Sequence, residues 1–284
     1  MSRGRCYARF VGSVDVVVVS YNSSGELRGC VETLASLEGV TVTVVDNASS
    51  DGSLEVIADL QVGRVALSEN GGFGHGCNVG WKKGSAPYVL FLNPDARIDG
   101  GSLERLATVL ETTPRAGAVA PRITHADGSL DYSQRRFPRL RSTYARALFL
   151  HRVFPSASWT DELVRDPDAY AAPGSPDWVS GACILVRRSV LEEIGGFDEG
   201  FFLWYEDVDL AKRLHDAGYS NLIAGSARVG HAGAEAFVQV DRREQQAIRL
   251  RSVERYIRLH HAWTMPAAAP LLRLSRRLRA GGAR

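Results

Sequence analysis

The sequence predicts an α/β fold in which a mainly parallel sheet is flanked by helices. The first observation is that apolar, β-rich runs alternate with helix-like patterns through the first hundred residues. The second is that the connections between these runs are long enough for the helical crossovers that parallel strands require. The third is composition, because 45% of the 284 residues are hydrophobic and 23% are charged, which is the balance of an ordinary folded chain.

Four strands are expected in the first hundred residues, at 14–20, 41–46, 64–68 and 88–92. A helix should follow the first strand, because apolar residues repeat there at helical spacing, namely Leu27, Cys30, Val31, Leu34 and Leu37. Ser23 and Glu26 have the spacing of a capping box that would begin this helix. Asp51 has the position of a cap for a second, short helix at about 54–58.

The second half of the chain is less regular. Asp127 and Gly128 predict a hairpin turn, and 155–176 has the composition of a long loop. A strand at 179–186 and a helix at 206–217, closed by Gly218, are expected to follow. We therefore expect an N-terminal extension (1–13), a folded domain (14–240) and a helical C-terminal tail (241–284).

The net charge of +2 is unevenly distributed. Residues 242–284 contain 11 arginines and two glutamates, a net charge of +9, so the rest of the chain carries −7. Apolar residues lie between the arginines of the tail, namely Ile248, Val253, Tyr256 and Ile257, and 270–279 is a short basic amphipathic segment. This pattern favours contact with a membrane surface. An arginine-rich tail with one helix packed on the domain is the alternative.

Other sequence features indicate where in the cell the protein is expected. No apolar run approaches the roughly 18 residues that a membrane-spanning helix needs. The N-terminus lacks the apolar stretch of a secretory signal, and the four cysteines form no Cys-x-x-Cys pair. We therefore expect a cytoplasmic protein with free thiols, peripheral on the inner face of the cell membrane.

Polar clusters follow the four expected strands. They are Ser20, Tyr21 and Asn22; Asp46 and Asn47; Asn70 to Gly72; and Asn93 to Asp95. The carboxyl ends of parallel strands share one edge of the sheet, where α/β proteins bind ligands, so these clusters should meet in space. Each residue taken alone has an ordinary interpretation as a turn former or a helix cap.

The glycine-rich stretch 70–80 allows a backbone to approach phosphate ahead of a helix. It departs from the dinucleotide fingerprint, because Cys77 stands at the third glycine position and the stretch follows the third strand instead of the first. A nucleotide-dependent oxidoreductase nevertheless stays open as an alternative. So does a non-enzymatic adaptor for membrane or nucleic acid that acts through the basic tail.

Six motifs occur in order between Val14 and His231: VVVVSYN (16–22), VVDNASSDGS (44–53), NGGFGHGCNVG (70–80), YVLFLNPDA (88–96), GACILVRR (181–188) and GGFDEGFFLWYEDVDLAKRL (195–214). Together they resemble the family 2 glycosyltransferases of GT-A fold, closest to bacterial rhamnosyltransferases that act on polyprenyl-diphosphate-linked sugars. The resemblance implies an inverting enzyme that moves a deoxyhexose, L-rhamnose from dTDP-rhamnose, to a hydroxyl of a lipid-linked or polysaccharide acceptor in cell-envelope glycan synthesis. It also implies a donor half at 14–100 and an acceptor half at 101–240.

The resemblance assigns residues to the donor side of the site. A dTDP- or UDP-sugar would contact Ser20, Tyr21, Asn22, Asp46, Asn47, Asn70, Gly72, Asn78, Asn93 and Asp95. The fold usually has two aspartates flanking one residue, and this chain has Asn93–Pro94–Asp95 instead. Asp95 is therefore the expected ligand of Mg²⁺ or Mn²⁺, and His231 matches a second ligand whose imidazole suits Mn²⁺ better. A lone histidine also has an ordinary structural role.

On the acceptor side, Asp207 matches the family's catalytic base. An inverting transfer needs a carboxylate that removes the acceptor hydroxyl proton, and a place in the first helical turn would stabilise its ionised form by about 0.3–1 kcal/mol. Acceptor contacts are assigned to Gly181, Trp204, Glu206 and Arg135. Trp204 could equally be a core aromatic and Glu206 a helix cap. No nucleic acid is expected as a partner, and the oligomeric state stays open.

Overall fold

An eight-stranded sheet forms the centre of the computed structural model, which describes residues 13–139, 141–142, 145, 150–154, 157, 159, 162–231, 241–266 and 269–270. The strand order is β3-β2-β1-β4-β9-β6-β10-β5. Its strands are β1 (Val14–Ser20), β2 (Val40–Asp46), β3 (Gly63–Ala66), β4 (Tyr88–Leu92), β5 (Ala96–Ile98), β6 (Ala116–Thr124), β9 (Cys183–Arg187) and β10 (Ser220–His231). A separate two-stranded sheet pairs β7 (Gln134–Arg135) with β8 (Trp178–Val179).

Most of the pairings in the large sheet are parallel, as the sequence predicts. Strand β1 runs parallel to β2 and β4, β2 to β3, and β6 to β10. Strand β9 lies antiparallel between β4 and β6, and β5 is antiparallel to β10 at the edge. The single strand expected at 179–186 is therefore wrong in one respect: β8 and β9 are two strands in different sheets, joined by the short turn 180–182.

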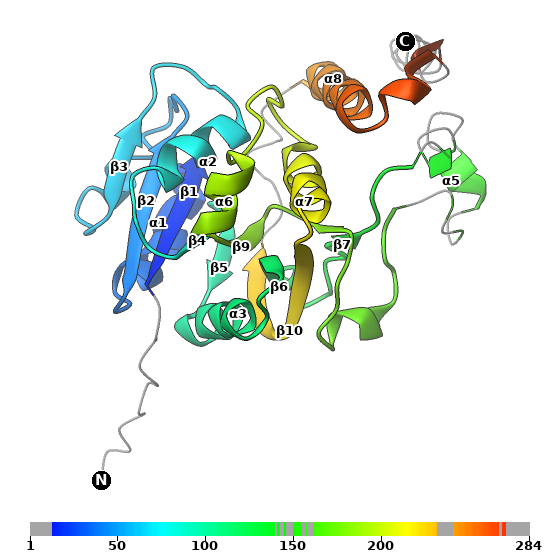
Figure 1. The fold of residues 1–284 in the computed structure, drawn as a ribbon. Coiled ribbons are helices and arrows are strands. Elements are labelled where there is room, and N and C mark those ends of the chain that lie inside the picture. Colours follow the sequence, from blue (N-terminus) through cyan, green and yellow to red (C-terminus); the bar gives the residue numbers. More distant parts are fainter. Residues whose placement is uncertain are drawn as a thin grey trace.

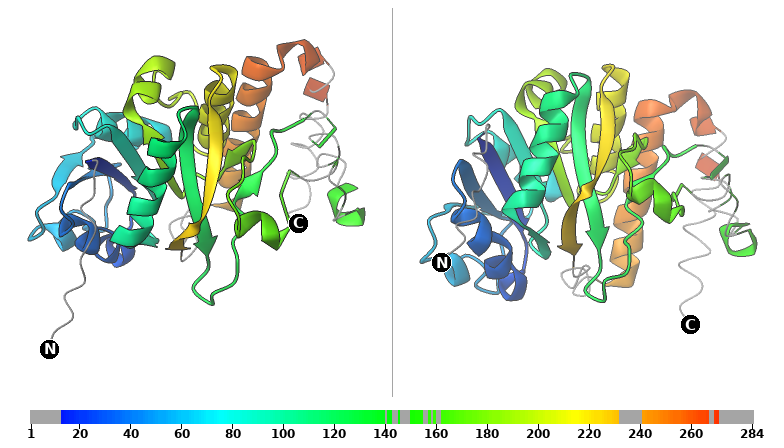
Figure 2. Two further views of the ribbon diagram at one scale, coloured as in Figure 1. Left: turned by 60° about the horizontal axis from the view of Figure 1, so that its bottom comes forward. Right: turned by 90° about the horizontal axis from the view of Figure 1, so that it is seen from below.

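Helices cover both faces of the sheet (Figures 1 and 2). Helices α1 (Ser24–Ala35) and α3 (Gly100–Thr112) pack on one face, and α2 (Phe73–Trp81), α6 (Arg188–Ile194) and α7 (Glu206–Asp216) on the other. The remaining helices are α5 (Leu150–Val153), α8 (Arg242–His260), and the 3-10 helices η1 (Glu55–Ile57), η2 (Pro167–Tyr170) and η4 (Ala262–Thr264). This is the three-layer α/β arrangement expected from the alternating pattern.

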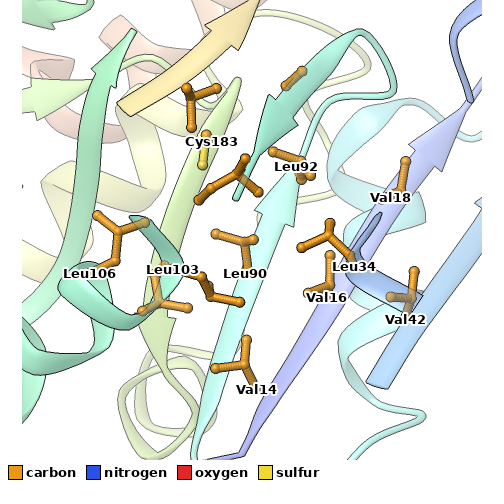
Figure 3. Close-up of a cluster of buried hydrophobic side chains, with 14 of the residues drawn as sticks. Val14, Val16, Val18, Leu34, Val42, Leu90, Leu92, Leu103, Leu106 and Cys183 are labelled. Carbon is orange, nitrogen blue, oxygen red and sulfur yellow. The ribbon is translucent and has the colours of Figure 1, made fainter. Parts of the chain in front are cut away.

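Alternate residues of the buried strands supply the two halves of the core. On one face Val14, Val16 and Val18 of β1 and Leu90 and Leu92 of β4 contact the apolar faces of α1 and α3 (Figure 3). On the other face Val17, Val19, Val89 and Phe91 contact α2, α6 and α7. A fully buried side chain of this kind stabilises a fold by about 1.5–3 kcal/mol. The strand ends are therefore fixed in position by packing.

Helix α8 lies on the outer side of α7 (Figure 1). The apolar residues of its stripe face inward: Ile248, Tyr256 and Ile257 are buried, and Tyr256 packs with Trp178, Phe201 and Val208. The expectation that this stripe meets a membrane is therefore wrong, and the alternative of a helix packed on the domain is confirmed. The segment 271–279 lies outside the described residues. In the part of the chain that the structure describes, no helix is long and apolar enough to cross a membrane.

Two local predictions about helix starts need correction. Ser23 does stand before α1, but its hydroxyl donates to the carbonyl of Tyr21 instead of capping the helix, and Glu26 pairs with Arg97. Asp51 accepts hydrogen bonds from Ser24 and Ser53, so it joins two loops and does not cap η1. Glu26 and Asp51 thus bind partners that are 71 and 27 residues away, and Ser23 bonds its own turn.

Candidate active site

The candidate site lies at the carboxyl edge of the sheet, where the strand order reverses. Strand β1 has β2 on one side and β4 on the other, which makes the edge between β1 and β4 the switch point at which α/β proteins bind ligands. The predicted polar clusters follow β1, β2 and β4 directly, and the glycine-rich loop follows β3. The prediction that residues distant in the sequence meet at one edge is confirmed for the backbone.

Backbone hydrogen bonds connect three of these clusters. The N–H of Asn47 donates to the carbonyl of Ser20 (2.8 Å), and its side-chain Nδ2 donates to the carbonyl of Gly72 (3.0 Å). Asp46 uses its carboxylate to hold Ser49, which in turn accepts from the N–H of Asn22. These contacts join the residues that follow β1 (20–22), β2 (46–49) and β3 (70–72) into one group, which is called the cradle below.

Gly72 fits tightly under the segment that precedes α7. Its φ of +89° is one that favours glycine, and a Cβ at this position would overlap the carbonyl of Phe202. The same carbonyl accepts the N–H of Phe73 at 3.1 Å. The glycine-rich loop and the start of α2 therefore pack directly against residue 202, which is 129 positions further along the chain than Phe73.

Asn78 has a different position from the one the resemblance implies. It is buried in α2, and its amide donates to the carbonyl of Phe197 and the carboxylate of Glu199. Its carbonyl oxygen accepts from Trp81 and from the N–H of Phe197. Because all four hydrogen bonds of the amide are made within the protein, Asn78 has no polar atom left for a nucleotide sugar. The structure therefore argues against a donor contact and gives Asn78 a structural role.

Asp95 and His231 lie together, as expected, although they are 136 residues apart. Residue 231 is paired with Ala96 across the β10–β5 ladder, which brings the imidazole Nε2 to 3.2 Å from Asp95 Oδ1. On its other side, Nδ1 of His231 is 3.9 Å from a carboxylate oxygen of Asp131. Burial lowers the pKa of His231, but the hydrogen bonds and charges of Asp131 and Asp95 outweigh it and raise the pKa to about 9.

The donor set around Asp95 fits a divalent cation. Oδ2 of Asp95 is buried without a hydrogen-bond partner, and Nε2 of His231 lies 3.2 Å from the other oxygen of the same carboxylate. A divalent cation that displaces the proton of His231 would bind both side chains. In the described ranges no three His, Cys, Asp or Glu side chains are placed to hold a metal by themselves. A cation at this point would therefore need further oxygen ligands, such as those of a diphosphate.

Asp207 lies in the first turn of α7, as predicted. Its Oδ2 accepts the N–H of Gly181 (3.0 Å) and its Oδ1 accepts the N–H of Val208 (2.8 Å). Burial raises the pKa of Asp207 above its usual range, while these two N–H groups and the charge of Arg135 oppose the rise. Each carboxylate oxygen of Asp207 keeps a second lone pair that can accept a proton. Asp207 is thus a fixed, partly exposed carboxyl whose raised pKa makes it a better proton acceptor.

Glu206 is adjacent in sequence but occupies a different environment. It is 6% exposed and lies beside Gly74 of α2. Burial, followed by the proximity of Glu206, raises the pKa of the Cys77 thiol in the same helix. Burial, followed by the charge of Asp207, raises the pKa of Glu206 well above its usual range. The structure therefore argues against the expected acceptor contact, because the carboxyl of Glu206 is buried beside α2 and its raised pKa favours the protonated form.

The two remaining acceptor candidates flank Asp207. Arg135, on β7, lies 5.3 Å from the ring centroid of Trp178, and its Nε is buried without a partner. Its charge acts on Asp207. Trp204 is half-buried and, like Tyr205, has a positive φ (61° and 73°), which is uncommon for a residue with a bulky side chain.

A single short segment connects the carboxyl of Asp207 to the loop that carries Asp95. Gly181 donates to Asp207, and the next residue, Ala182, accepts the N–H of Asn93 at 2.9 Å. A Cβ at Gly181 would be 3.3 Å from Cβ of Asp207, which is a tight contact that Asp207 could accommodate only by shifting. The structure therefore brings the predicted base and the predicted metal ligand to the same edge of the sheet.

Sequence reasoning missed several residues of this site. Asp131 faces His231, and Glu199 joins α2 to the segment before α7. The confirmed turn at Asp127–Gly128 was an available signal for Asp131, because it sends the chain back beside β6. Nothing in the local sequence marks Glu199.

The comparisons with known proteins agree on one family. The family described as Glycosyl transferase family 2 matches residues 15–195. The chain is 33% identical over 236 residues to an N-acetylglucosaminyl-diphospho-decaprenol L-rhamnosyltransferase of Mycobacterium tuberculosis, covering 78% of this chain and 76% of that protein. It is 28% identical over 218 residues to the rhamnosyltransferase WbbL of Escherichia coli, covering 72% and 78%.

Solved structures show the same fold at lower identity. A mannosyltransferase from Pyrobaculum calidifontis in complex with GDP-Man and Mn²⁺ superposes with a TM-score of 0.57 at 18% identity, covering 96% of this chain and 79% of the other. The structure of GalNAc-T7 with UDP, GalNAc and Mn²⁺ gives a TM-score of 0.60 at 16% identity, over 78% of this chain and 44% of that one. Both support the expected GT-A architecture.

Proposed function

The chain belongs to glycosyl transferase family 2, and from this premise we propose that it is an inverting rhamnosyltransferase that acts on a polyprenyl-diphosphate-linked sugar in cell-envelope glycan synthesis. The proposed donor is dTDP-rhamnose. Family membership decides against the oxidoreductase and the non-enzymatic adaptor. The observation that carries the proposal is the position of Asp207, held by Gly181 at the same sheet edge as Asn93 and Asp95.

The cradle at the strand ends is the proposed donor site. Tyr21 is exposed beside the buried Ser20 and can stack on the nucleotide base. The buried hydroxyl of Ser20 and Oδ1 of Asn47 have no partner in the protein, so they can bind polar groups of the nucleotide. The glycine-rich loop allows its backbone to come close to the sugar diphosphate, next to the N-terminus of α2.

Asp207 is the proposed base. One of its oxygens takes the proton of the acceptor hydroxyl while the hydroxyl oxygen forms a bond to the anomeric carbon. The bond from that carbon to the diphosphate breaks, and the nucleoside diphosphate leaves with the electron pair from the opposite face. Gly181 fixes the carboxylate in place. Arg135, whose Nε is buried without a partner, is positioned to bind the diphosphate of the acceptor.

Asp95 and His231 would hold a divalent cation with the diphosphate of the donor. When bound, the ion would neutralise the charge of the leaving group. Mn²⁺ suits the mixed carboxylate and imidazole set better than Mg²⁺.

A donor panel tests the proposed reaction. Purified protein with Mn²⁺ is offered dTDP-rhamnose, UDP-GlcNAc, UDP-galactose or GDP-mannose, together with a polyprenyl-diphosphate-GlcNAc acceptor, and the product is followed by mass spectrometry. We expect a rhamnosylated lipid only with dTDP-rhamnose, and thermal stabilisation by that donor. If only a donor other than dTDP-rhamnose supports transfer, the sugar assignment is wrong. If none of the donors supports transfer, the proposed acceptor or the proposed reaction is wrong.

We also propose that the exposed face of α8 and η4 meets an anionic membrane surface that carries the acceptor. Leu259 and Trp263 are 49% and 81% exposed, and Arg251 and Arg258 are exposed on the same helix. Aromatic and arginine side chains together suit the headgroup region of a bilayer.

Co-sedimentation with vesicles tests this contact. The Trp263→Ser variant should bind vesicles containing anionic lipid less well than the wild type. Arg64→Gln, on the distant edge strand β3, is the matched control and should bind normally (Figure 1). Equal binding by all three proteins would overturn the assignment of this face.

A further inference from the structure

We infer that α8 is a positioning element for the catalytic base, and that Arg255 exerts this effect through the segment 198–205, here called the strap. The strap runs directly into Glu206 and Asp207 at the start of α7. The inference rests on the proposed role of Asp207 as base. It concerns residues that lie outside the donor and acceptor contacts described above.

The strap is attached to α8 by several different contacts. Arg255 forms a bidentate ion pair with Asp198: Nε lies 3.0 Å from Oδ2, and Nη2 lies 2.8 Å from Oδ1. Its guanidinium also lies 5.3 Å from the ring centroid of Phe201. A Cβ at Gly200 would overlap this guanidinium, so the backbone of the strap is in direct contact with Arg255.

Two further contacts extend the attachment toward the base. The hydroxyl of Ser252 donates to the carbonyl of Leu203 at 2.8 Å. The ring of Tyr256 is fully buried and lies 5.5 Å from that of Tyr205. The helix therefore holds the strap at both of its ends and at its middle.

The opposite side of the strap is attached to the donor loop. Glu199 binds His75 and Asn78 of α2, both at 2.8 Å, and the carbonyl of Phe202 accepts the N–H of Phe73. The strap thus lies between α2, which follows the glycine-rich loop, and α8. Its position decides where α7 begins relative to the donor cradle.

The backbone before the base supports a positioning role. Trp204 and Tyr205 both have positive φ, and consecutive aromatic residues in this region persist only where surrounding contacts fix them. If α8 releases the strap, this turn can relax and Asp207 would move relative to Gly181. A displacement of about 1 Å can lower turnover by roughly 10²-fold while substrate binding is kept.

A second anchor fixes α7 itself to the same helix. His260 Nε2 lies 2.7 Å from Oδ1 of Asp209, and Arg213 Nε lies 2.7 Å from its Oδ2. Asp209 is buried, two residues beyond the base. Both anchors hold the first turn of α7 from the side of α8, which explains why this helix belongs to the functional domain.

The test compares Arg255→Gln with Arg28→Gln. Arg28 lies on α1, on the opposite face of the sheet from α7, and makes an exposed bidentate ion pair with Asp59 (2.7 and 2.9 Å). It has no place in the proposed site or membrane face, so it is the matched control. We expect kcat of Arg255→Gln to fall by roughly 10- to 100-fold with little change in KM for the donor. Arg255→Lys should recover part of the loss, because it restores the charge but not the paired geometry. Arg28→Gln should behave as the wild type.

Hydrogen–deuterium exchange gives a readout that does not depend on activity. Amides of 198–209 should exchange faster in Arg255→Gln than in the wild type and the control, while those of β1 and β4 should not change. Asp198→Asn, which breaks the same pair from the other side, should reproduce both effects if Arg255→Gln is poorly folded.

Three results separate the possible outcomes. A wild-type kcat with unchanged exchange in both strap variants would overturn the inference. A fall in kcat that is matched by a rise in donor KM and by faster exchange throughout the sheet would also overturn it, because it would show a general structural role. If the wild type transfers no sugar at all, the proposed function fails, and the exchange experiment still decides whether α8 fixes the strap.

Discussion

The backbone N–H of Gly181 donates a hydrogen bond to the carboxylate of Asp207 at 3.0 Å, and this contact joins the start of α7 to the turn before β9. Because β9 is antiparallel to β4, its first residues lie beside the residues that follow β4. Strand β9, which is antiparallel in the middle of the sheet, thus brings the proposed base close to the loop after β4 that carries the proposed metal ligand.

Enlarging residue 181 should disturb the base. In Gly181→Ala the new Cβ would be 3.3 Å from Cβ of Asp207 and 3.6 Å from its Oδ2, so the carboxylate must shift by a few tenths of an ångström. We expect kcat to fall by about 10-fold with an unchanged donor KM. Steady-state kinetics checks this, and a kcat equal to that of the wild type would show that the contact does not position the base.

Removal of the cation should abolish transfer reversibly. Activity should be lost in EDTA and restored by Mn²⁺. Asp95→Asn replaces a carboxylate ligand by a weaker amide, so at least about 10-fold more Mn²⁺ should be needed for half-maximal activity. Titration of activity with Mn²⁺ measures this. An unchanged titration curve in Asp95→Asn would remove Asp95 from the metal site.

Glu206 and Asp207 should respond differently to the same chemical change. Burial and the neighbouring charge of Asp207 raise the pKa of Glu206 well above its usual range, which favours the protonated, uncharged carboxyl. Glu206→Gln keeps the shape of this uncharged form and should leave kcat close to that of the wild type. If Glu206→Gln lost turnover while Asp207→Asn kept it, Glu206 would be the base and Asp207 would not.

The pair of Asp198 and Arg255 should make stability depend on pH. Burial tends to raise the pKa of Asp198, but Arg255 and the N–H of Gly200 outweigh it and hold the pKa below its usual range. A carboxyl with a lowered pKa stabilises the fold fully above the unfolded value of about 3.9 and loses this contribution as the pH falls through that value and then through the lower folded pKa.

Thermal unfolding of wild type and Arg255→Gln at several pH values measures this dependence. The difference in Tm should be largest near pH 7 and should shrink between about pH 5 and pH 3. It should be modest, and smaller in high salt, because the pair is partly exposed. A difference in Tm that is constant over this range would show that the charge of Asp198 does not contribute.

Much of the fold could be predicted from the sequence because it depends on local patterns. Short apolar, β-rich runs located β1, β2 and β4 to within a residue, and the helix at Glu206 began where expected. The position of the site followed from topology, since parallel strands place their carboxyl ends at one edge. The expectation for Asp207 came from the resemblance to family 2 glycosyltransferases, and its place in the first turn of α7 is the part that the helix pattern predicted.

The contacts that could not be predicted join residues far apart in the chain. Glu26 pairs with Arg97, 71 residues away, instead of completing a capping box. Asn78 binds Phe197, 119 residues away, instead of a ligand. In both cases the partner is a residue that only the tertiary fold brings close, so the local pattern does not reveal it. The inward face of α8 has the same explanation, because Tyr256 of its stripe packs with Trp178 and Phe201.

Replacement of Asp207 tests the central claim most directly. Asn in Asp207→Asn can still accept the N–H of Gly181 but cannot take a proton, so kcat for rhamnosyl transfer should fall by about 10² or more while stabilisation by the donor is kept. Asp216→Asn, an exposed carboxylate at the other end of α7, should leave kcat unchanged. Transfer at the wild-type rate by Asp207→Asn would contradict the account.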